Sequence, residues 1–375
     1  MNIVIAPDSF KNCLSAGKVA NSIAKGVQKV IPQASILQIP ISDGGEGLLE
    51  ALVVSSGGKL VEINVRDPLN RIISAQYGIL TDGITAVVEM AKASGLELLQ
   101  ERERDPLITS TFGTGQLIDD ALNRGCTRII IGLGGSATND AGMGMIKALG
   151  GKFLNLEGEM IGDGGGALDR LHSIDLTNFD KRLIDCEIIA ACDVSNPLTG
   201  PEGASVIYGG QKGGDPKVLE QLDKNLTHYA SVLKSNLGKE VAGVAGAGAA
   251  GGMGAALLAF FNANLRSGIE LIIEILHVEK HIRTADVVFT GEGKIDHQTL
   301  YGKTISGIAA IAKKHKVPVI AITGMIGDNI ENLYDLGITS VFSIVNKPMS
   351  LEESIVNVDA LIQSCVENIL RARIH

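Results

Sequence analysis

The chain has 375 residues, of which 45% are hydrophobic and 20% are charged, and its formal net charge is −9. This length exceeds what one ordinary core holds and predicts two domains, and the composition is that of a globular protein. The negative charge, with no basic block, excludes a nucleic-acid surface, because neutralising phosphates takes clustered Lys and Arg.

The two ends of the chain show the same alternation of strands and helices. Near the N-terminus, NIVIAP predicts a strand, the spacing of Val19, Ile23 and Val27 predicts one face of a helix, and SILQIPI predicts the next strand. Towards the C-terminus, DVVFTG, VPVIAIT and SVFSIV predict strands separated by helices. Such alternation is typical of a doubly wound parallel sheet.

The middle of the chain differs, because KLVEINV, IISAQYGIL and TAVVEMA follow one another without intervening helices. Their closeness predicts antiparallel or mixed pairing. We therefore expect an α/β protein with a discontinuous Rossmann- or flavodoxin-like domain, residues 1–65 plus 285–375, and an inserted mixed α/β domain, residues 66–284.

Cysteine usage and the N-terminus predict a cytoplasmic protein. The five cysteines are odd in number and lack CxxC spacing, which favours reduced thiols. The start MNIVIAPDSFK has too short an apolar run for a signal peptide. The uncharged segment 241–265 is dominated by Gly and Ala and lacks flanking aromatic residues, so we expect no membrane span.

Two polar clusters near the N-terminus follow apolar runs, where an open parallel sheet has its ligand crevice. In PDSFK, Ser9 and Lys11 offer a hydroxyl and an ammonium group to an anionic substrate. In SDGGEG, Asp43 stands beside a predicted helix start. Helix capping is the alternative for both clusters, since Asp and Ser are common N-caps.

The glycine-rich stretch GLGGSATNDAGMG, residues 132–144, follows the predicted strand RIII. It fits the GxGxx[GA] pattern, but no acidic residue ends a following strand about 20 residues on, so a dinucleotide fingerprint is a weak match. Backbone N–H groups at a helix start favour phosphate instead, which predicts an anion cradle. Its predicted contacts are the cofactor-binding Gly134 and Gly135 and the substrate-binding Ser136, Asn139 and Asp140.

A literal GxGxxG occurs at Gly246, Gly248 and Gly251, with Glu270 near the position of a ribose-binding acid. It leaves a NAD-dependent oxidoreductase of a small hydroxy acid as the alternative function. The chain has neither a complete Walker A loop nor the GxSxG motif of the α/β-hydrolases.

Phosphoryl transfer depends mainly on positioning and charge neutralisation, and the remaining motifs contain suitable groups. In GEGKID we expect Gly291, Glu292 and Lys294 to bind the nucleotide. Carboxylates are the ligands that Mg2+ prefers, so Asp193, Glu292 and Asp296 are the predicted magnesium ligands.

Long motifs in order along the chain carry a resemblance to a known family. They are IAPDSFK with LSA, PISDGGEG, GTGQLI, GLGGSATNDAG, GPEGA, GAGAAGGMGAAL and TGEGKIDHQTLYGKT. From end to end the chain resembles the bacterial glycerate kinases. The resemblance implies a two-domain α/β enzyme that phosphorylates D-glycerate with ATP and Mg2+. It favours 2-phospho-D-glycerate as product, with 3-phospho-D-glycerate as the alternative.

Side-chain chemistry suggests roles within that reaction. Lys11 or one of Arg66 and Arg71 would bind the glycerate carboxylate, since a guanidinium can hold both carboxylate oxygens. Asp43 or Asp193 would orient the attacking hydroxyl. Lys11, Asp43 and Asp193 are therefore the predicted catalytic residues. The oligomeric state stays open, with a homodimer as one alternative.

Overall fold

The computed structural model describes residues 1–11, 13–41, 47–300 and 303–374. The chain divides into two compact units: unit 1 comprises Met1–Asp43, Glu50–Ser56 and Ser267–His375, and unit 2 comprises Gly44–Leu49 and Gly57–Arg266. Each unit is built on its own sheet, and the predicted α/β class is confirmed.

Unit 1 contains a parallel sheet with the strand order β13-β12-β11-β1-β2. Its strands are β1 (Asn2–Ile5), β2 (Ser35–Gln38), β11 (Val287–Ile295), β12 (Val319–Ile326) and β13 (Ile338–Ser343). Its helices are α1 (Ala16–Val30), α8 (Gly268–Ile275), α9 (Val278–Ile282), α10 (Lys303–Lys314), α11 (Glu331–Leu336), α12 (Leu351–Val356) and α13 (Val358–Ile374).

The order of these strands creates a switch point between β1 and β11. Along the chain, β1 is followed by β2 on one side, and the chain later returns with β11 on the other side. This is the flavodoxin-like order, in which ligands bind beyond the carboxyl ends of the strands at the switch point. The segment after β1 is joined to β11 there, since the Asp8 N–H donates to the carbonyl of Gly291 within β11 at 2.8 Å.

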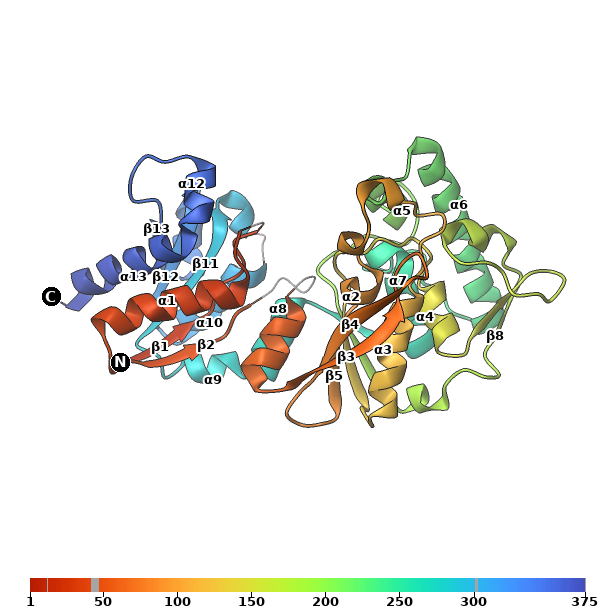
Figure 1. Cartoon of the computed structure of the whole chain (residues 1–375), viewed down its shortest axis with the longest axis horizontal. Helices are drawn as coiled ribbons and strands as arrows, with labels where there is room; N and C mark the ends of the chain where they lie inside the picture. The colour runs from red at the N-terminus through yellow and green to blue at the C-terminus, as the bar shows by residue number, and fades with distance from the viewer. Residues whose placement is uncertain (12, 42–46, 301–302, 375) are drawn as a thin grey trace. The chain divides into compact units, whose positions relative to one another are not determined.

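Helices α1 and α13 pack against each other in unit 1 (Figure 1). The expected apolar face of α1 is buried, with Val19, Ile23 and Val27 at 0% exposure. A Cβ on Gly26 would lie 2.9 Å from the Gln363 carbonyl oxygen, so glycine permits this close approach of the two helices.

Unit 2 contains a six-stranded sheet with the order β10-β9-β6-β5-β4-β3 and a separate β7-β8 pair. The strands are β3 (Lys59–Arg66), β4 (Ile72–Ile79), β5 (Thr85–Glu89), β6 (Arg128–Gly132), β7 (Lys152–Leu154), β8 (Ser173–Asp175), β9 (Glu187–Ala191) and β10 (Asn264–Arg266). The helices are α2 (Ala91–Ser94), α3 (Phe112–Asn123), α4 (Met143–Ala148), α5 (Ala204–Tyr208), α6 (Pro216–Leu237) and α7 (Ala249–Phe261).

The sheet of unit 2 is mixed, as the spacing of its first strands predicts. Strands β3, β4 and β5 pair antiparallel, whereas β5, β6, β9 and β10 run parallel. The carboxyl ends of these four parallel strands share one edge of the sheet. Open α/β sheets bind their ligands at this kind of edge.

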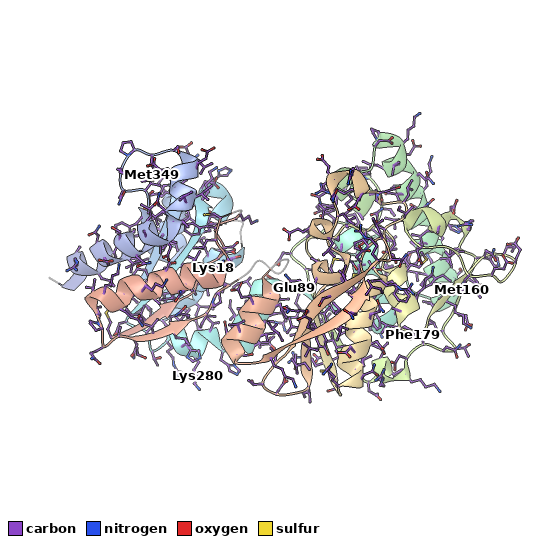
Figure 2. All side chains as sticks on the ribbon, viewed as in Figure 1. Lys18, Glu89, Met160, Phe179, Lys280 and Met349 are labelled. Carbon is purple, nitrogen blue, oxygen red and sulfur yellow. The ribbon has the colours of Figure 1, made fainter. Side chains whose placement is uncertain are left out.

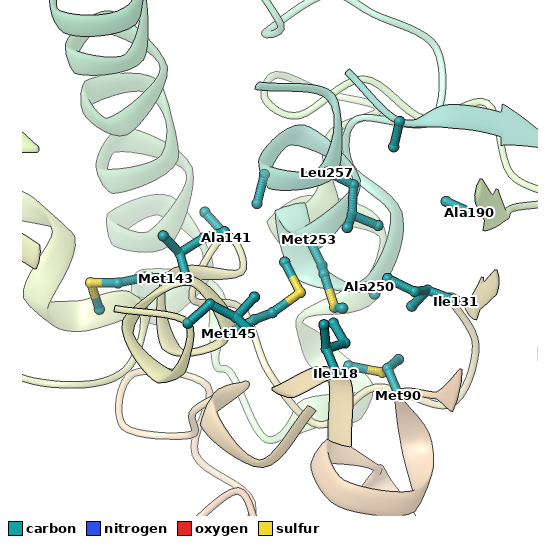
Figure 3. Packing of buried hydrophobic residues seen from close by; sticks show 14 of the residues in the cluster. Met90, Ile118, Ile131, Ala141, Met143, Met145, Ala190, Ala250, Met253 and Leu257 are labelled. Carbon is teal, nitrogen blue, oxygen red and sulfur yellow. The ribbon is translucent and has the colours of Figure 1, made fainter. Parts of the chain in front are cut away.

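In the core of unit 2, helices α3 and α7 pack against that sheet, and α4 packs against both of these helices. Ile118 of α3, Met145 of α4 and Met253 of α7 are almost completely buried and lie close together in Figure 3. Methionine suits such irregular contacts because its side chain is flexible. No helix among the described residues is both long enough and apolar enough to span a membrane.

The limits of the two units differ from the boundaries expected at 65/66 and 284/285. Strand β3 pairs with β4 along its whole length, so it belongs to unit 2 rather than to the terminal domain. Helices α8 and α9 contact α10 and belong to unit 1. The expected boundaries placed these elements by chain position, whereas strand pairing and helix contacts decide it.

Candidate functional site

A cavity of about 570 Å³ lies in unit 1 at the switch point between β1 and β11. Its polar lining consists of Asp8, Ser9, Lys11, Glu292, Lys294, Thr299, Thr304 and Ser354. Its apolar lining includes Phe10, Ile305, Met325, Ile344, Val345, Leu351, Ile355 and Val358. The volume is within the range of small-molecule sites, and the presence of both polar and apolar lining residues suits an amphipathic ligand.

Four predicted site residues therefore share one cavity: Ser9, Lys11, Glu292 and Lys294. The Ser9 N–H donates to Asp8 Oδ1 at 2.6 Å, which shapes the turn after β1. Gly291 has a packing reason as well, because a Cβ there would lie 2.2 Å from the Ile322 carbonyl oxygen on β12. Asp43 lies outside the described residues.

Glu292 is a carboxyl group of this cavity whose pKa is strongly shifted. Thr299 Oγ1 donates to Glu292 Oε1 at 2.7 Å. The pKa of Glu292 is raised to about 7: burial is the main cause, Asp8 and Asp296 add to the rise, and the Thr299 bond and Lys11 oppose it. Near neutral pH the group therefore exists in both protonation states, which is typical of functional sites.

Asp296 is held beside Glu292 by local bonds. Lys294 Nζ lies 2.7 Å from Asp296 Oδ2, and the Asp296 N–H donates to Thr299 Oγ1 at 3.2 Å. Lys294 lines the cavity and forms this ion pair, so a ligand phosphate bound there would compete with Asp296 for its ammonium group.

The second set of predicted residues lies at the carboxyl edge of the parallel strands in unit 2. Strand β5 ends at Glu89, labelled in Figure 2, β6 leads into Gly134 and Gly135, and β9 leads into Asp193. Strands β6 and β9 are neighbours, with Gly132 opposite Ala191. Gly135 has φ 65°, which favours glycine at this turn.

Asp140 stabilises this loop through buried hydrogen bonds. It is 0% exposed, and its carboxylate accepts hydrogen bonds from the Thr111 N–H (2.9 Å) and hydroxyl (2.8 Å) and from the N–H groups of Gly142 and Gly144 (both 3.1 Å). The Met145 N–H donates to Thr111 Oγ1 at 2.9 Å. These N–H groups at the start of α4 are occupied, so the predicted phosphate cradle is not built from them.

We expect Asp140→Ala to destabilise the protein by about 3 kcal/mol or more, because it leaves several buried donors without an acceptor. Urea denaturation followed by circular dichroism measures the loss. The exposed Asp185 provides a matched control, and Asp185→Ala should leave the transition almost unchanged. An Asp140→Ala transition equal to that of the control would contradict this structural role.

The remaining candidate ligands of the loop differ in burial. Asn139 is 0% exposed, and its Nδ2 donates to Ser205 Oγ at 2.8 Å. Ser136 is 8% exposed and lies next to exposed Gly135. The segment 134–136 is therefore the part of the predicted cradle that a ligand can reach.

The two predicted arginines already have partners within unit 2. Arg71 Nε lies 2.5 Å from Oδ2 of buried Asp67, and its Nη1 lies 2.7 Å from Glu103 Oε1. The Arg66 guanidinium lies over the Phe112 ring, 4.5 Å from its centroid. A glycerate carboxylate at Arg71 would have to compete with two carboxylates of the protein.

The predicted magnesium ligands are divided between the units, with Glu292 and Asp296 in unit 1 and Asp193 in unit 2. Among the described residues, no group of three or more His, Cys, Asp or Glu side chains is arranged to hold a metal ion. Magnesium bound with a nucleotide commonly has one or two protein carboxylates as ligands, and phosphate oxygens supply others. The two carboxylates Glu292 and Asp296 would therefore be enough protein ligands for such a site.

Residues 3–373 match the Glycerate kinase family. The chain belongs to this family. It is 49% identical to the Glycerate 2-kinase of Escherichia coli (strain K12) over 94% of this chain and 93% of that protein. It is 47% identical to the Glycerate kinase of Halalkalibacterium halodurans over 98% and 97%. A solved structure from Salmonella typhimurium LT2, named for glycerate kinase 2, has a TM-score of 0.90 at 46% identity, covering 99% of this chain and 98% of that one.

Within this glycerate kinase family member, the GxGxxG motif is a packing device and not a dinucleotide fingerprint. The described element before it is helix α6, whereas the fingerprint requires a strand. A Cβ on Gly248 would lie 2.2 Å from the Pro197 carbonyl oxygen, and one on Gly251 would lie 2.0 Å from that of Thr138. The predicted NAD alternative is therefore wrong for this motif, because the protein's own backbone fills the space beside its glycines.

Sequence reasoning missed two polar residues of these sites, Thr299 and Lys212. Lys212 is 1% exposed, and its Nζ donates to Ser136 Oγ at 2.8 Å and to the Thr138 carbonyl at 2.7 Å. Burial lowers its pKa to about 7, while Asp140 opposes the fall. The sequence signal that could have singled out Lys212 is the run GGQKGG, in which Gln and Lys stand between two pairs of glycines.

Proposed function

We propose that the chain transfers the γ-phosphoryl group of ATP to a hydroxyl of D-glycerate and forms 2-phospho-D-glycerate. The observation that carries this proposal is the similarity, over 94% of the chain, to a protein named Glycerate 2-kinase. The polar and apolar parts of the cavity in unit 1 support ATP as the donor, because a nucleotide has an apolar base and an anionic tail.

The nucleotide is assigned to the cavity at the switch point. The apolar wall from α12 and the start of α13 offers contacts to the base, and Lys11 and Lys294 offer charge to the phosphates. Phosphoryl transfer needs such neutralisation, because negative charge stays on the transferred oxygens throughout the step. In this assignment Ser9 donates a hydrogen bond to a phosphate oxygen.

Magnesium is assigned to Glu292 and Asp296. The donor set fits a hard cation, because both groups are carboxylates and their mutual repulsion contributes to the raised pKa of Glu292. A bound divalent cation would neutralise phosphate charge. Thr299 holds Glu292 in place, and Lys294 holds Asp296.

Apart from Lys11, the groups assigned to glycerate lie in unit 2. The segment 134–136 offers backbone N–H groups and the Ser136 hydroxyl to an anionic oxygen, and Asp193 orients the attacking hydroxyl and accepts its proton. Lys11, Arg66 and Arg71 remain the predicted partners of the glycerate carboxylate. A homodimer and a cytoplasmic location stay predictions from the sequence.

The test is to incubate the protein with ATP, Mg2+ and D-glycerate. ADP release should depend on D-glycerate, and phosphorus NMR should place the phosphate on carbon 2. Lactate is the control substrate and should give no ADP release above background. A phosphate on carbon 3 would support the alternative product, and absent ADP release would overturn the proposal. The oxidoreductase alternative predicts a change in the absorbance of reduced nicotinamide without ATP. We expect this absorbance to stay unchanged.

A further inference from the structure

Lys212 connects two segments of unit 2 that are 76 residues apart in the chain. It ends the 3-10 turn Gly210–Lys212, which lies between α5 and α6. Its ammonium group is bound inside the loop that follows β6, where Ser136 Oγ and the Thr138 carbonyl are its acceptors. Burying a charged group this completely is costly unless it is paired, so a specific reason for the lysine is expected.

The turn that carries Lys212 is fixed by a close backbone approach. Gly213 has φ 97°, and a Cβ there would lie 2.1 Å from the Arg104 carbonyl oxygen. Burial lowers the pKa of Lys212 to about 7, and the buried carboxylate of Asp140 opposes this fall and so favours the ammonium form. Lys212 is therefore held by its backbone on one side and by the loop after β6 on the other.

The bond to Lys212 determines which way the Ser136 hydroxyl points. Lys212 Nζ donates in this bond, so Ser136 Oγ accepts. The hydroxyl proton of Ser136 must then point away from Lys212. Ser136 lies next to exposed Gly135, so a ligand that reaches this segment meets a hydrogen-bond donor.

Other polar atoms of the same loop support a ligand at this place. Thr138 Oγ1 and Asn139 Oδ1 are buried and have no hydrogen-bond partner among the described residues. Both side chains are 0% exposed. Buried polar groups are nearly always satisfied by protein, water or ligand, so these two atoms leave hydrogen-bonding capacity unused directly beside the accessible segment 134–136.

We propose that Lys212 is a positioning residue that turns the Ser136 hydroxyl towards an anionic oxygen of the substrate. The ligand chemistry is a carboxylate or phosphate oxygen, which glycerate and ATP respectively supply. The inference rests on the proposed function, because it assigns a task to the loop that the function places at the substrate.

The test is a double-mutant cycle of Ser136→Ala and Lys212→Met, with kcat and KM measured for ATP and for D-glycerate. Loss of one hydrogen bond to a charged ligand should raise one KM roughly tenfold in each single variant with little change in kcat. Because Lys212 acts through Ser136, the double variant should resemble Ser136→Ala. A raised KM for D-glycerate identifies the carboxylate as the ligand, and a raised KM for ATP identifies a phosphate.

Exposed Lys217, at the start of α6, provides the matched control, and Lys217→Met should behave as the wild type. Unchanged KM values in Lys212→Met, or effects that multiply in the double variant, would overturn the inference. If Lys212→Met does not fold, Lys212→Leu replaces it, since Leu also removes the donor to Ser136.

A direct binding measurement separates this inference from the proposed function. Each variant is heated with and without D-glycerate or ATP, and the ligand-induced rise in Tm is recorded. A wild type that shows this rise without ADP formation contradicts the proposed function alone. Equal ligand-induced rises in the wild type, Ser136→Ala and Lys212→Met contradict the inference alone.

Discussion

Asp193→Asn is expected to lower kcat by 100-fold or more while the fold is retained. Asp193 follows strand β9 at the edge where the neighbouring strand β6 leads into Gly134 and Gly135. A carboxylate that orients the attacking hydroxyl and accepts its proton contributes about 10²–10⁴-fold to the rate. Asparagine keeps the size of the side chain but removes the negative charge. Initial rates at saturating ATP and D-glycerate measure the effect.

A control for Asp193 is available on the same strand. Glu187 begins β9 at its opposite end, and its side chain is 61% exposed and paired with Arg128 at 3.1 Å. Glu187→Gln should therefore leave kcat close to that of the wild type. A near-normal kcat in Asp193→Asn would exclude both the hydroxyl-orienting and the metal-binding role. A raised Mg2+ requirement in that variant would favour the metal-binding role.

Lys11→Met is expected to raise the KM for ATP by about 10–100-fold. Lys11 lines the cavity at the switch point and faces the carboxyl group of Glu292 closely enough to lower its pKa. A charge-assisted hydrogen bond to phosphate contributes about 1.5–3 kcal/mol, which corresponds to this range. The substitution also leaves three carboxyl groups with less compensating charge, so binding of anionic ATP weakens further.

Steady-state kinetics with each substrate varied in turn measure the effect of Lys11→Met. Lys18 lies on α1, is exposed and is labelled in Figure 2, so Lys18→Met is the matched control and should keep both KM values. An effect confined to the KM for D-glycerate would instead indicate that Lys11 binds the glycerate carboxylate, which is the other role predicted for it. Unchanged KM values for both substrates would exclude both roles.

The strands and helices could be predicted because hydrophobic periodicity is a local property. The apolar spacing of α1 and the alternation at both chain ends correspond to buried faces and to the parallel sheet of unit 1. The limits of the two units were harder to predict from the sequence, because β3 belongs to unit 2 through its pairing with β4. Which partner a strand takes depends on residues far away in the chain.

The roles of individual side chains were harder to predict than the limits of the units. Asp140 and Ser136 stand four positions apart in one motif, yet Asp140 caps helix starts in the interior whereas Ser136 lies beside an exposed glycine. Arg71 looked available for a carboxylate but is paired with Asp67 and Glu103. The sequence pattern does not distinguish an internal acceptor from a ligand.

The sequence by itself determined the α/β class, the order of the elements and the membership of the glycerate kinase family, because these depend on periodicity and on long contiguous motifs. Three features are visible only in the folded protein: which motif residues share a cavity, that α12 and α13 contribute to its apolar lining, and that Lys212 binds the loop at Ser136. The physical reason is that burial, pairing and the direction of a hydrogen bond arise only when distant segments pack together.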